Sequence, residues 1–298
     1  MNSNSVRPCP ICGAAADGRG FPYETCFNGS TFYYVRCCSC KAVFVDPVPD
    51  SDTFSKMYAK ASYHDAHYLD RDTTPYDQSA RLLSRFLPLG ASVLDYGCGL
   101  GLFLKAIRTE GFLATGVEFD QEAADFAAKN SGSPAFAVAT FLSDANGATY
   151  DALHFGDVLE HLPDPAATVR ELLRFVKPGG LVFVEGPLEN NASPVFWAAQ
   201  MFGAIKRLAK PNFKGSSPPT HLLRVNAAQQ LAFFTRVDAG LSLLHWDVYE
   251  TGWPYAGGAL VKRAIAGAAS AIGGKRISDV TFGNRFHGLF RLPDEARS

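Results

Sequence analysis

A glycine turn at the end of an apolar run is the part of this sequence best able to do chemistry. Residues 93–101 read Val-Leu-Asp-Tyr-Gly-Cys-Gly-Leu-Gly. Gly97 and Gly99 let the backbone turn tightly and approach a ligand with no Cβ in between, and Gly101 lets the following helix pack close to the strand. The segment therefore predicts a cofactor-binding turn between a buried strand and a helix.

The spacing of this turn and two neighbouring carboxylates indicate the kind of cofactor. A dinucleotide fingerprint, G-x-G-x-x-G, needs a glycine where this chain has Leu102. Asp95, just before the glycines, is badly placed for a diphosphate but can accept hydrogen bonds near an ammonium, such as that of S-adenosylmethionine. Glu118 ends the next apolar run, where it would hold ribose hydroxyls. The pattern favours a nucleoside cofactor without a pyrophosphate.

Four cysteines near the amino terminus form a second chemical signal. Cys9 with Cys12 and Cys37 with Cys40 are two C-x-x-C pairs, each able to give two thiolates to one tetrahedral ion. Cys38 is an alternative ligand, but only the pair 37 and 40 keeps the two-residue spacing. Four sulfurs leave no open position for water, so we expect a structural Zn²⁺ in a zinc ribbon. A segment of about 45 residues needs such a metal because its own core is too small.

The elements that must position these residues follow from the alternation of apolar runs with amphipathic segments. This alternation predicts a doubly wound α/β sheet with the cofactor pocket at the carboxyl ends of its strands. The last apolar run roughly alternates apolar and polar residues, as an antiparallel edge or inserted strand does. Asp164 before Pro165 predicts a helix start. The strands are expected near residues 92–95, 113–118, 135–139, 151–155, 181–185, 241–249 and 284–291.

With these motifs in this order, the chain resembles the class I S-adenosylmethionine-dependent methyltransferases. Residues 95–101 match their first motif and residues 116–118 their second. Residues 150–165 resemble the fourth strand and its exit in the ubiquinone-biosynthesis O-methyltransferase type, and residues 176–181 the approach to strand five. The resemblance implies a Rossmann-like seven-stranded methyltransferase sheet with an antiparallel last strand. It implies S-adenosylmethionine as cofactor, bound by Asp95, Tyr96, Gly97, Cys98, Gly99, Gly101, Glu118, Phe119, Thr140, Phe141, Phe155 and Gly156.

Within that set the adenine contact departs from the family pattern. Family members often carry an acid after strand three, whereas this chain offers Thr140 and Phe141, with Asp144 several residues on. We expect Thr140 or the backbone of Phe141 to contact the adenine, the alternative being a loop that only packs. Phe119, beside Glu118, would cover the ring.

The chain divides into three parts. Its order also resembles bacterial methyltransferases with an amino-terminal zinc-ribbon module, many of them associated with sugars, surface polysaccharides or secondary metabolites. We expect the ribbon over residues 1–50, linking helices over 51–90 and the methyltransferase domain over 91–298, with a lid or insertion over 190–237. The linking helices, near 57–68 and 74–87, carry tyrosines that either pack or touch ligand: Tyr58, Tyr63 and Tyr76.

Length and composition agree with a cytoplasmic enzyme. At 298 residues and 47% hydrophobic, the chain can bury one large core plus a small module. It has no window of eighteen apolar residues, and its first ten residues lack the hydrophobic core of a signal peptide. Seven cysteines in a reducing compartment argue for metal or packing roles rather than disulfides.

Acid and histidine side chains near strand four are the candidate catalytic residues. Asp157, Glu160 and His161 share one face if their segment is helical. In the resembling ubiquinone-type enzymes the matching E-x-x-E-H positions are linked to a divalent metal, so one interpretation is that these residues hold Mg²⁺ or another divalent ion, which would lower the pKa of a hydroxyl. The alternatives are a pocket-shaping role and His161 as a general base without metal. His221, in a loop before a helix beginning near Asn226, is either a substrate contact or base or a loop-fixing residue.

Charge distribution indicates the acceptor. Residues 190–298 hold 13 Lys and Arg against 6 Asp and Glu, whereas residues 1–189 hold 15 against 23. Residues 190–237 contain no acid, which predicts a small anionic acceptor, the alternative being a solvated basic face. Residues 194–207 combine bulky apolar residues with a basic end, which fits a transient membrane-surface contact or, preferably, a lid helix buried against the core. The basic residues of the acid-free segment 190–237 are Lys206, Arg207, Lys210, Lys214, Arg224 and Arg236.

Two other functions compete with O-methylation of a small anionic metabolite, such as a sugar or nucleotide-linked sugar. A ribbon that gripped RNA would make the protein an RNA methyltransferase. No nucleic-acid partner is expected, because residues 1–46 carry four Lys and Arg against three acids and no basic stripe. A non-catalytic cofactor-binding scaffold is the other alternative, but the motifs look too complete for it.

Overall fold

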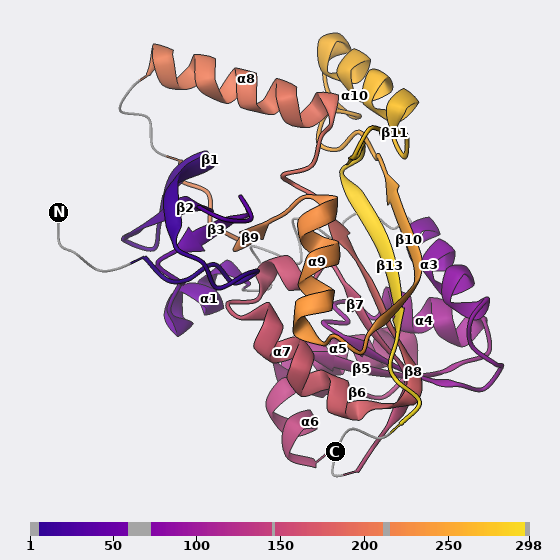
Figure 1. The fold of residues 1–298 in the computed structure, drawn as a ribbon. Helices are drawn as coiled ribbons and strands as arrows, with labels where there is room; N and C mark the ends of the chain where they lie inside the picture. Colours follow the sequence, from indigo (N-terminus) through magenta and orange to yellow (C-terminus); the bar gives the residue numbers. More distant parts are fainter. Residues whose placement is uncertain (1–5, 59–72, 145–146, 211–214, 296–298) are drawn as a thin grey trace.

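Two sheets dominate the architecture (Figure 1). The computed structural model describes residues 6–58, 73–144, 147–210 and 215–295, so the predictions for Tyr63 and Lys214 lie outside the described residues. The larger sheet has seven strands in the order β10-β13-β8-β7-β4-β5-β6. Its strands are β4 (Ser92–Tyr96), β5 (Leu113–Glu118), β6 (Ala135–Ala137), β7 (Tyr150–Gly156), β8 (Val176–Pro187), β10 (Ser242–Tyr249) and β13 (Arg285–Arg291).

The topology of the large sheet confirms the predicted Rossmann-like class. β6, β5, β4, β7 and β8 run parallel, whereas β13 inserts between β8 and β10 and pairs antiparallel with both. β8 begins at Val176, five residues before the expected start, because the Lys-Pro-Gly-Gly segment at 177–180 is itself part of the strand. The last strand in the chain is therefore antiparallel, as predicted.

Helices cover both faces of this sheet, α3 and α4 on one and α7 and α9 on the other (Figure 1). Local capping sets where several begin. Asp164 Oδ1 accepts from the amide of Ala167 at the start of α7, as predicted, and Asn226 with Gln229 forms a capping box at the start of α9. The helices are α1 (Ser51–Met57), α3 (Thr74–Ser84), α4 (Leu102–Thr109), α5 (Gln121–Ser131), α6 (Val138–Asp144), α7 (Pro165–Leu172), α8 (Pro194–Ala209), α9 (Ala227–Val237) and α10 (Leu260–Ile272). Short elements complete the described chain: the 3-10 turns η1 (Leu159–His161) and η2 (Leu173–Phe175), and the hairpin β11 (Arg276–Ile277) with β12 (Val280–Thr281).

The amino-terminal module is a small antiparallel sheet that the rest of the chain completes. Its strands are β1 (Ala16–Phe27), β2 (Ser30–Cys37) and β3 (Val43–Asp46), followed by β9 (Leu223–Arg224) from far along the sequence. Val43 pairs with Arg224 and Phe44 with Leu223. The ribbon is thus joined to the 190–237 segment by a shared sheet.

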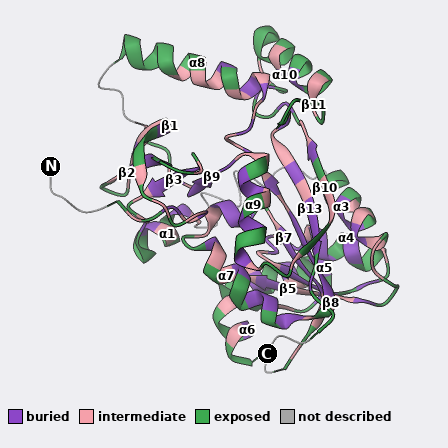
Figure 2. Ribbon diagram, in the orientation of Figure 1, coloured by how far each residue is buried: buried purple, intermediate pink, exposed green. Residues whose placement is uncertain are grey.

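The ribbon and the large domain also share one hydrophobic core. Buried strand residues dominate the centre of the large sheet, shown in purple in Figure 2. The same cluster that contains Leu94, Leu153 and Val182 continues into Val35 and Phe44 of the ribbon. Gln229 Nε2 adds a 2.6 Å hydrogen bond to the carbonyl of Cys40. Because the ribbon and the large domain share buried side chains and this hydrogen bond, the ribbon is held in a fixed position against α9.

The prediction that residues 194–207 bury their apolar side chains as a lid helix against the core is wrong. α8 packs on α10 and β1, and only Val195 and Ala198 are buried. Trp197 is 50% exposed, and Met201 and Ile205 are also exposed. Among the described residues, no helix has both the length and the apolar composition needed to cross a bilayer. Contact of this helix with a membrane surface stays a prediction.

Candidate active site

Two glycines of the turn, Gly97 and Gly101, are packed so closely that a Cβ at either position would clash with a neighbour. Gly97 has φ +79°, and a Cβ there would lie 2.5 Å from Cγ2 of Val158. Gly101 has φ +74° and caps α4, and a Cβ there would lie 2.8 Å from the carbonyl oxygen of Ala127. Because Val158 follows β7, the turn directly contacts the segment that carries the candidate catalytic residues.

Glu118 lies beside the same turn. Its Oε2 accepts a 2.7 Å hydrogen bond from the amide of Gly99, and its Oε1 accepts one of 2.7 Å from Phe119. Phe119 is 62% exposed, so its ring is available to a ligand next to the carboxylate. Both residues lie next to the glycine turn, and their contacts with ribose and adenine remain predictions.

The other predicted cofactor residues are buried to different degrees. Phe155 is fully buried against Tyr96, with ring centroids 5.8 Å apart, and the Cys98 side chain is also buried. Phe141 is buried against other aromatic rings, whereas Thr140 is exposed. Both belong to α6, a helix where a loop had been expected. Gly156 ends β7. Their roles in cofactor binding remain predictions.

Asp95 is buried and paired with a histidine that sequence reasoning missed. Asp95 Oδ1 lies 2.7 Å from Nδ1 of His154, its register partner on β7. Nε2 of His154 forms a 3.3 Å ion pair with Glu185, without hydrogen-bond geometry. Burial alone would lower the pKa of His154, but the carboxylates of Asp95 and Glu185 outweigh it and raise that pKa to about 9. The sequence did carry a signal for this pair, because His154 is a histidine within an apolar strand that neighbours the strand of Asp95.

Glu185 extends this network to helix α3 and strand β13. It accepts a 2.5 Å hydrogen bond from the Ser79 hydroxyl, and its Oε2 lies 3.1 Å from Nε2 of His287. Although burial opposes ionisation, the two histidines lower the pKa of Glu185 well below its usual value. The ionised carboxylate thus holds His154 from the side opposite Asp95.

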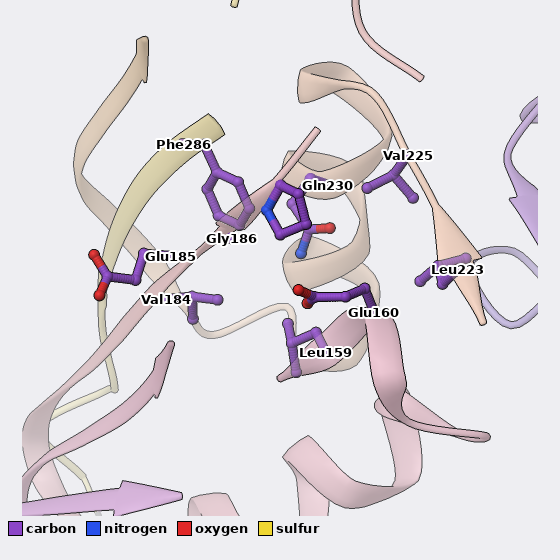
Figure 3. A pocket seen from close by; sticks show the side chains of 10 residues that line it. Leu159, Glu160, Val184, Glu185, Gly186, Leu223, Val225, Gln230 and Phe286 are labelled. Carbon is purple, nitrogen blue, oxygen red and sulfur yellow. The ribbon is translucent and has the colours of Figure 1, made fainter. Parts of the chain in front are cut away.

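A second cluster gathers three of the predicted catalytic side chains. One ligand atom from each of Glu160, His161 and His221 lies within 4.8 Å of the others. A backbone hydrogen bond brings His221 close to Glu160 and His161, because the amide of the next residue, Leu222, donates to the carbonyl of Glu160 at 2.7 Å. Glu160 also lines a pocket at the carboxyl end of β8, where Figure 3 shows it with Gln230 and Phe286 around one space.

Neighbouring groups fix the two imidazoles differently. Nδ1 of His161 lies 2.7 Å from the carbonyl oxygen of Thr220, which requires a proton on Nδ1 and leaves Nε2 as an acceptor. Burial and the neighbouring His221 lower the pKa of His161 to about 4. Nδ1 of His221 lies 2.8 Å from Glu189 Oε2. Burial would lower the pKa of His221, but the Glu189 carboxylate outweighs it and raises the pKa. His221 is therefore the more basic of the two.

Asp157 does not join this cluster. Nη2 of Arg285 lies 2.8 Å from both of its carboxylate oxygens. Its backbone is left-handed, with φ +53°, and only the three residues of η1 are helical, so the predicted shared helical face with Glu160 and His161 does not form. Asp157 is a structural anchor between β7 and β13 in this geometry.

Glu160, His161 and His221 have the donor set of a divalent-metal site. Oε1 of Glu160 is buried and has no hydrogen-bond partner among the described residues, so it is an unused ligand atom. One carboxylate and two imidazoles suit a transition metal better than Mg²⁺, which prefers oxygen ligands. A metal held by Glu160, His161 and His221 would polarise an acceptor hydroxyl.

The four predicted zinc ligands do come together. One sulfur from each of Cys9, Cys12, Cys37 and Cys40 lies within 4.8 Å of the others. The Cys9–Cys40 and Cys12–Cys37 Sγ distances are 3.7 and 3.4 Å. Sulfurs around a tetrahedral zinc, each at about 2.3 Å from it, lie roughly 3.8 Å apart. The cluster has the size and donor set of a closed structural zinc site, and Cys38 is outside it.

The sheet topology and the glycine turn define a class I S-adenosylmethionine-dependent methyltransferase. Residues 66–231 match the model of the methyltransferase domain family, and the chain belongs to that family. It is 34% identical over 176 residues to the ubiquinone biosynthesis O-methyltransferase of Vibrio parahaemolyticus, covering 55% of this chain and 72% of that protein. It is 29% identical over 174 residues to the protein of the same name from Vibrio cholerae, covering 55% of this chain and 69% of that protein.

The solved structures agree on the fold. The plantazolicin methyltransferase BpumL in complex with SAH matches 81% of this chain and 93% of its own, with a TM-score of 0.51 and 13% sequence identity. At this identity the likeness concerns the fold alone. The family match and the relatives named O-methyltransferase confirm the predicted class of S-adenosylmethionine-dependent methyltransferase.

Proposed function

We propose that this methyltransferase transfers the methyl group of S-adenosylmethionine to an oxygen atom of a small anionic metabolite. The observation that carries the proposal is the contact between the two halves of the site. The glycine turn at Gly97 packs on Val158, and the next turn of chain carries Glu160 and His161. A cofactor lying across the glycine turn would thus have the histidine cluster beside it.

Within this arrangement Asp95, Glu118 and Phe119 bind the cofactor, through its ammonium group, ribose and adenine. His154 acts as a positioning residue because it holds the Asp95 carboxylate at 2.7 Å. Methyl transfer depends mainly on alignment of the acceptor atom with the methyl carbon and the sulfur. A carboxylate held rigidly by His154 would fix the position of the cofactor for this alignment.

His221 is the general base of the proposed reaction. Glu189 holds its Nδ1–H and raises its pKa, so that Nε2 takes the hydroxyl proton while the acceptor oxygen bonds to the methyl carbon. The carbon–sulfur bond breaks in the same step, and the sulfonium becomes a neutral thioether. His161, which is neutral, packs edge-on against the His221 ring, with centroids 4.8 Å apart, and helps to hold that ring in place. If a metal occupies the cluster instead, it supplies the polarisation, and both histidines are ligands.

The anionic character of the acceptor rests on charge. The described part of the acid-free 190–237 segment borders the cluster through His221 and Arg224. Cations there attract an anionic ligand and orient it before reaction. The homologues named for O-methylation support oxygen as the acceptor atom.

A screen with methyl-labelled S-adenosylmethionine tests this function. Candidate acceptors are sugar phosphates, nucleotide-linked sugars and neutral sugars, with bulk RNA as a separate arm. We expect label in an ether or ester of an anionic small molecule. Label in RNA alone, or cofactor binding without any turnover, would contradict the proposal and favour an RNA methyltransferase or a scaffold.

A further inference from the structure

We propose that a cavity between the zinc ribbon, α8 and β9 binds the phosphate end of the acceptor, as a phosphate or diphosphate ester. The inference rests on the proposed function and names the substrate class for the same site. The cavity measures about 200 Å³, and three arginines line it against one carboxylate, that of Glu189. These arginines come from β1, β2 and β9: Arg19, Arg36 and Arg224.

The three guanidinium groups have donors to spare. Among the residues that the structure describes, the guanidinium of Arg36 has neither a carboxylate nor a hydrogen-bond partner. Nε of Arg224 is buried and also lacks a partner within the described chain. Arg19 pairs with Glu24 at 3.2 Å through one nitrogen only. Arginine forks match phosphate oxygens two at a time, so this excess of donors fits a phosphate or diphosphate.

An irregularity in β1 shapes the same wall. The β1–β2 ladder pairs Arg19 with Val35 and next pairs Glu24 with Tyr33, so residues 20–23 bulge out opposite a single residue of β2. Tyr23, in this bulge, has φ +80°, a left-handed conformation that is unusual for an aromatic residue. Bulges often redirect side chains beside functional sites.

The bulge and α8 give the cavity surfaces for a ring as well as for phosphate. Phe21 and Tyr23 line it from the ribbon, and Phe196 lines it from α8. Asn190 and Gln200 add amide groups that can hydrogen-bond sugar hydroxyls or a base. Because small-molecule sites usually measure about 300–1,000 Å³, a 200 Å³ cavity holds one end of an acceptor.

Glu189 links this cavity to the proposed base. Its Oε1 lies 3.5 Å from Nη1 of Arg224, and its Oε2 lies 2.8 Å from Nδ1 of His221. A phosphate held by the arginines would therefore lie one side chain away from the histidine that receives the proton. The ribbon would then be part of the acceptor site, beyond its role as a metal-stabilised module.

Calorimetry with the full zinc-loaded chain tests the assignment, using pyrophosphate, UDP and uridine as probes and SAH as a separate titration. We expect pyrophosphate and UDP to bind and uridine to bind much more weakly. Arg36→Gln should weaken pyrophosphate about tenfold or more, because it removes a charge-assisted contact. Arg291→Gln, an exposed cation at the far end of β13, should leave the affinity unchanged. Tighter binding of UDP than of pyrophosphate identifies a nucleoside diphosphate, and equal binding identifies the phosphate group alone.

The controls separate this inference from the function on which it rests. Normal SAH affinity with no binding of either phosphate probe would overturn the cavity assignment and leave the methyltransferase proposal standing. Phosphate binding that is the same in wild type, Arg36→Gln and Arg224→Gln would also overturn it, since the anion would then sit elsewhere. Loss of SAH binding in the wild type would instead overturn the proposed function itself.

Discussion

Raising the pH should destabilise this protein through one buried histidine. His154 lies between the carboxylates of Asp95 and Glu185 and has a pKa of about 9. The difference from an ordinary value of 6.5 corresponds to roughly 3 kcal/mol of folding free energy. Because the folded-state pKa is raised, this stabilisation is fully present below about pH 6.5 and is lost as the pH rises through about 9.

Urea unfolding at several pH values between 6 and 9.5 measures the effect. His154→Phe keeps an aromatic ring against Phe103, whose centroid lies 3.8 Å away, but removes the cation between the two carboxylates. The variant should lose roughly 3–5 kcal/mol at pH 6, as expected for a broken buried ion pair. It should also lose most of the pH dependence. Zinc-ligand titration affects both proteins alike, so the difference between their curves isolates His154.

A matched substitution elsewhere in the sheet guards against a general effect. His245→Phe alters a half-buried histidine of β10 that has no carboxylate partner within the described residues, and its curve should stay parallel to wild type. If His154→Phe is too unstable to measure, the wild-type decline of roughly 3 kcal/mol between pH 6.5 and 9.5 remains the test. A wild-type curve parallel to that of His154→Phe, or flat, would refute the reasoning.

Three further outcomes follow from the site. Gly97→Ala should abolish SAH binding in calorimetry because its Cβ meets Val158, whereas Gly90→Ala, with φ +78° and open space, should retain it; equal affinities would contradict the close packing. Cys12→Ser should lose the single bound zinc by elemental analysis and Cys26→Ser should keep it, and zinc in both would place the metal elsewhere. His221→Asn should lower kcat roughly 10²–10⁴-fold with SAH affinity unchanged, and unimpaired turnover would exclude it as the base.

The sequence was sufficient for features that depend on local signals. The order of apolar runs gave the sheet, and the alternation over residues 284–291 gave the antiparallel strand β13. Tight spacing within each C-x-x-C pair predicted the sulfur cluster, because two residues between cysteines leave little freedom of direction. In each case a short stretch of chain decides its own geometry.

Features that depend on distant pairs could not be predicted in the same way. Asp157 looked like a metal ligand until the fold brought Arg285 against it, 128 residues away. The pairing of Asp95 with His154 requires the order of β4 and β7, and that of His221 with Glu189 requires a loop to fold back on β8. The composition of α8 predicted that its apolar side chains are buried. In the structure only Val195 and Ala198 of this helix are buried, because burial depends on which elements pack against it.

Because the ribbon and the large domain share one core, we expect a zinc ion in the ribbon to affect the proposed acceptor side of the site. Gly97, Glu118 and Asp95 belong to or follow strands of the large sheet, whose core continues into the ribbon. In contrast, Arg224 lies in a strand that pairs with β3, and Gln229 bonds to the carbonyl of the zinc ligand Cys40. Loss of the metal should therefore loosen the loop that carries His221 before it disturbs the cofactor turn. In the proposed function, the large sheet therefore positions the methyl donor and the ribbon with β9 positions the acceptor, and Val158 against Gly97 is where the two parts of the site meet.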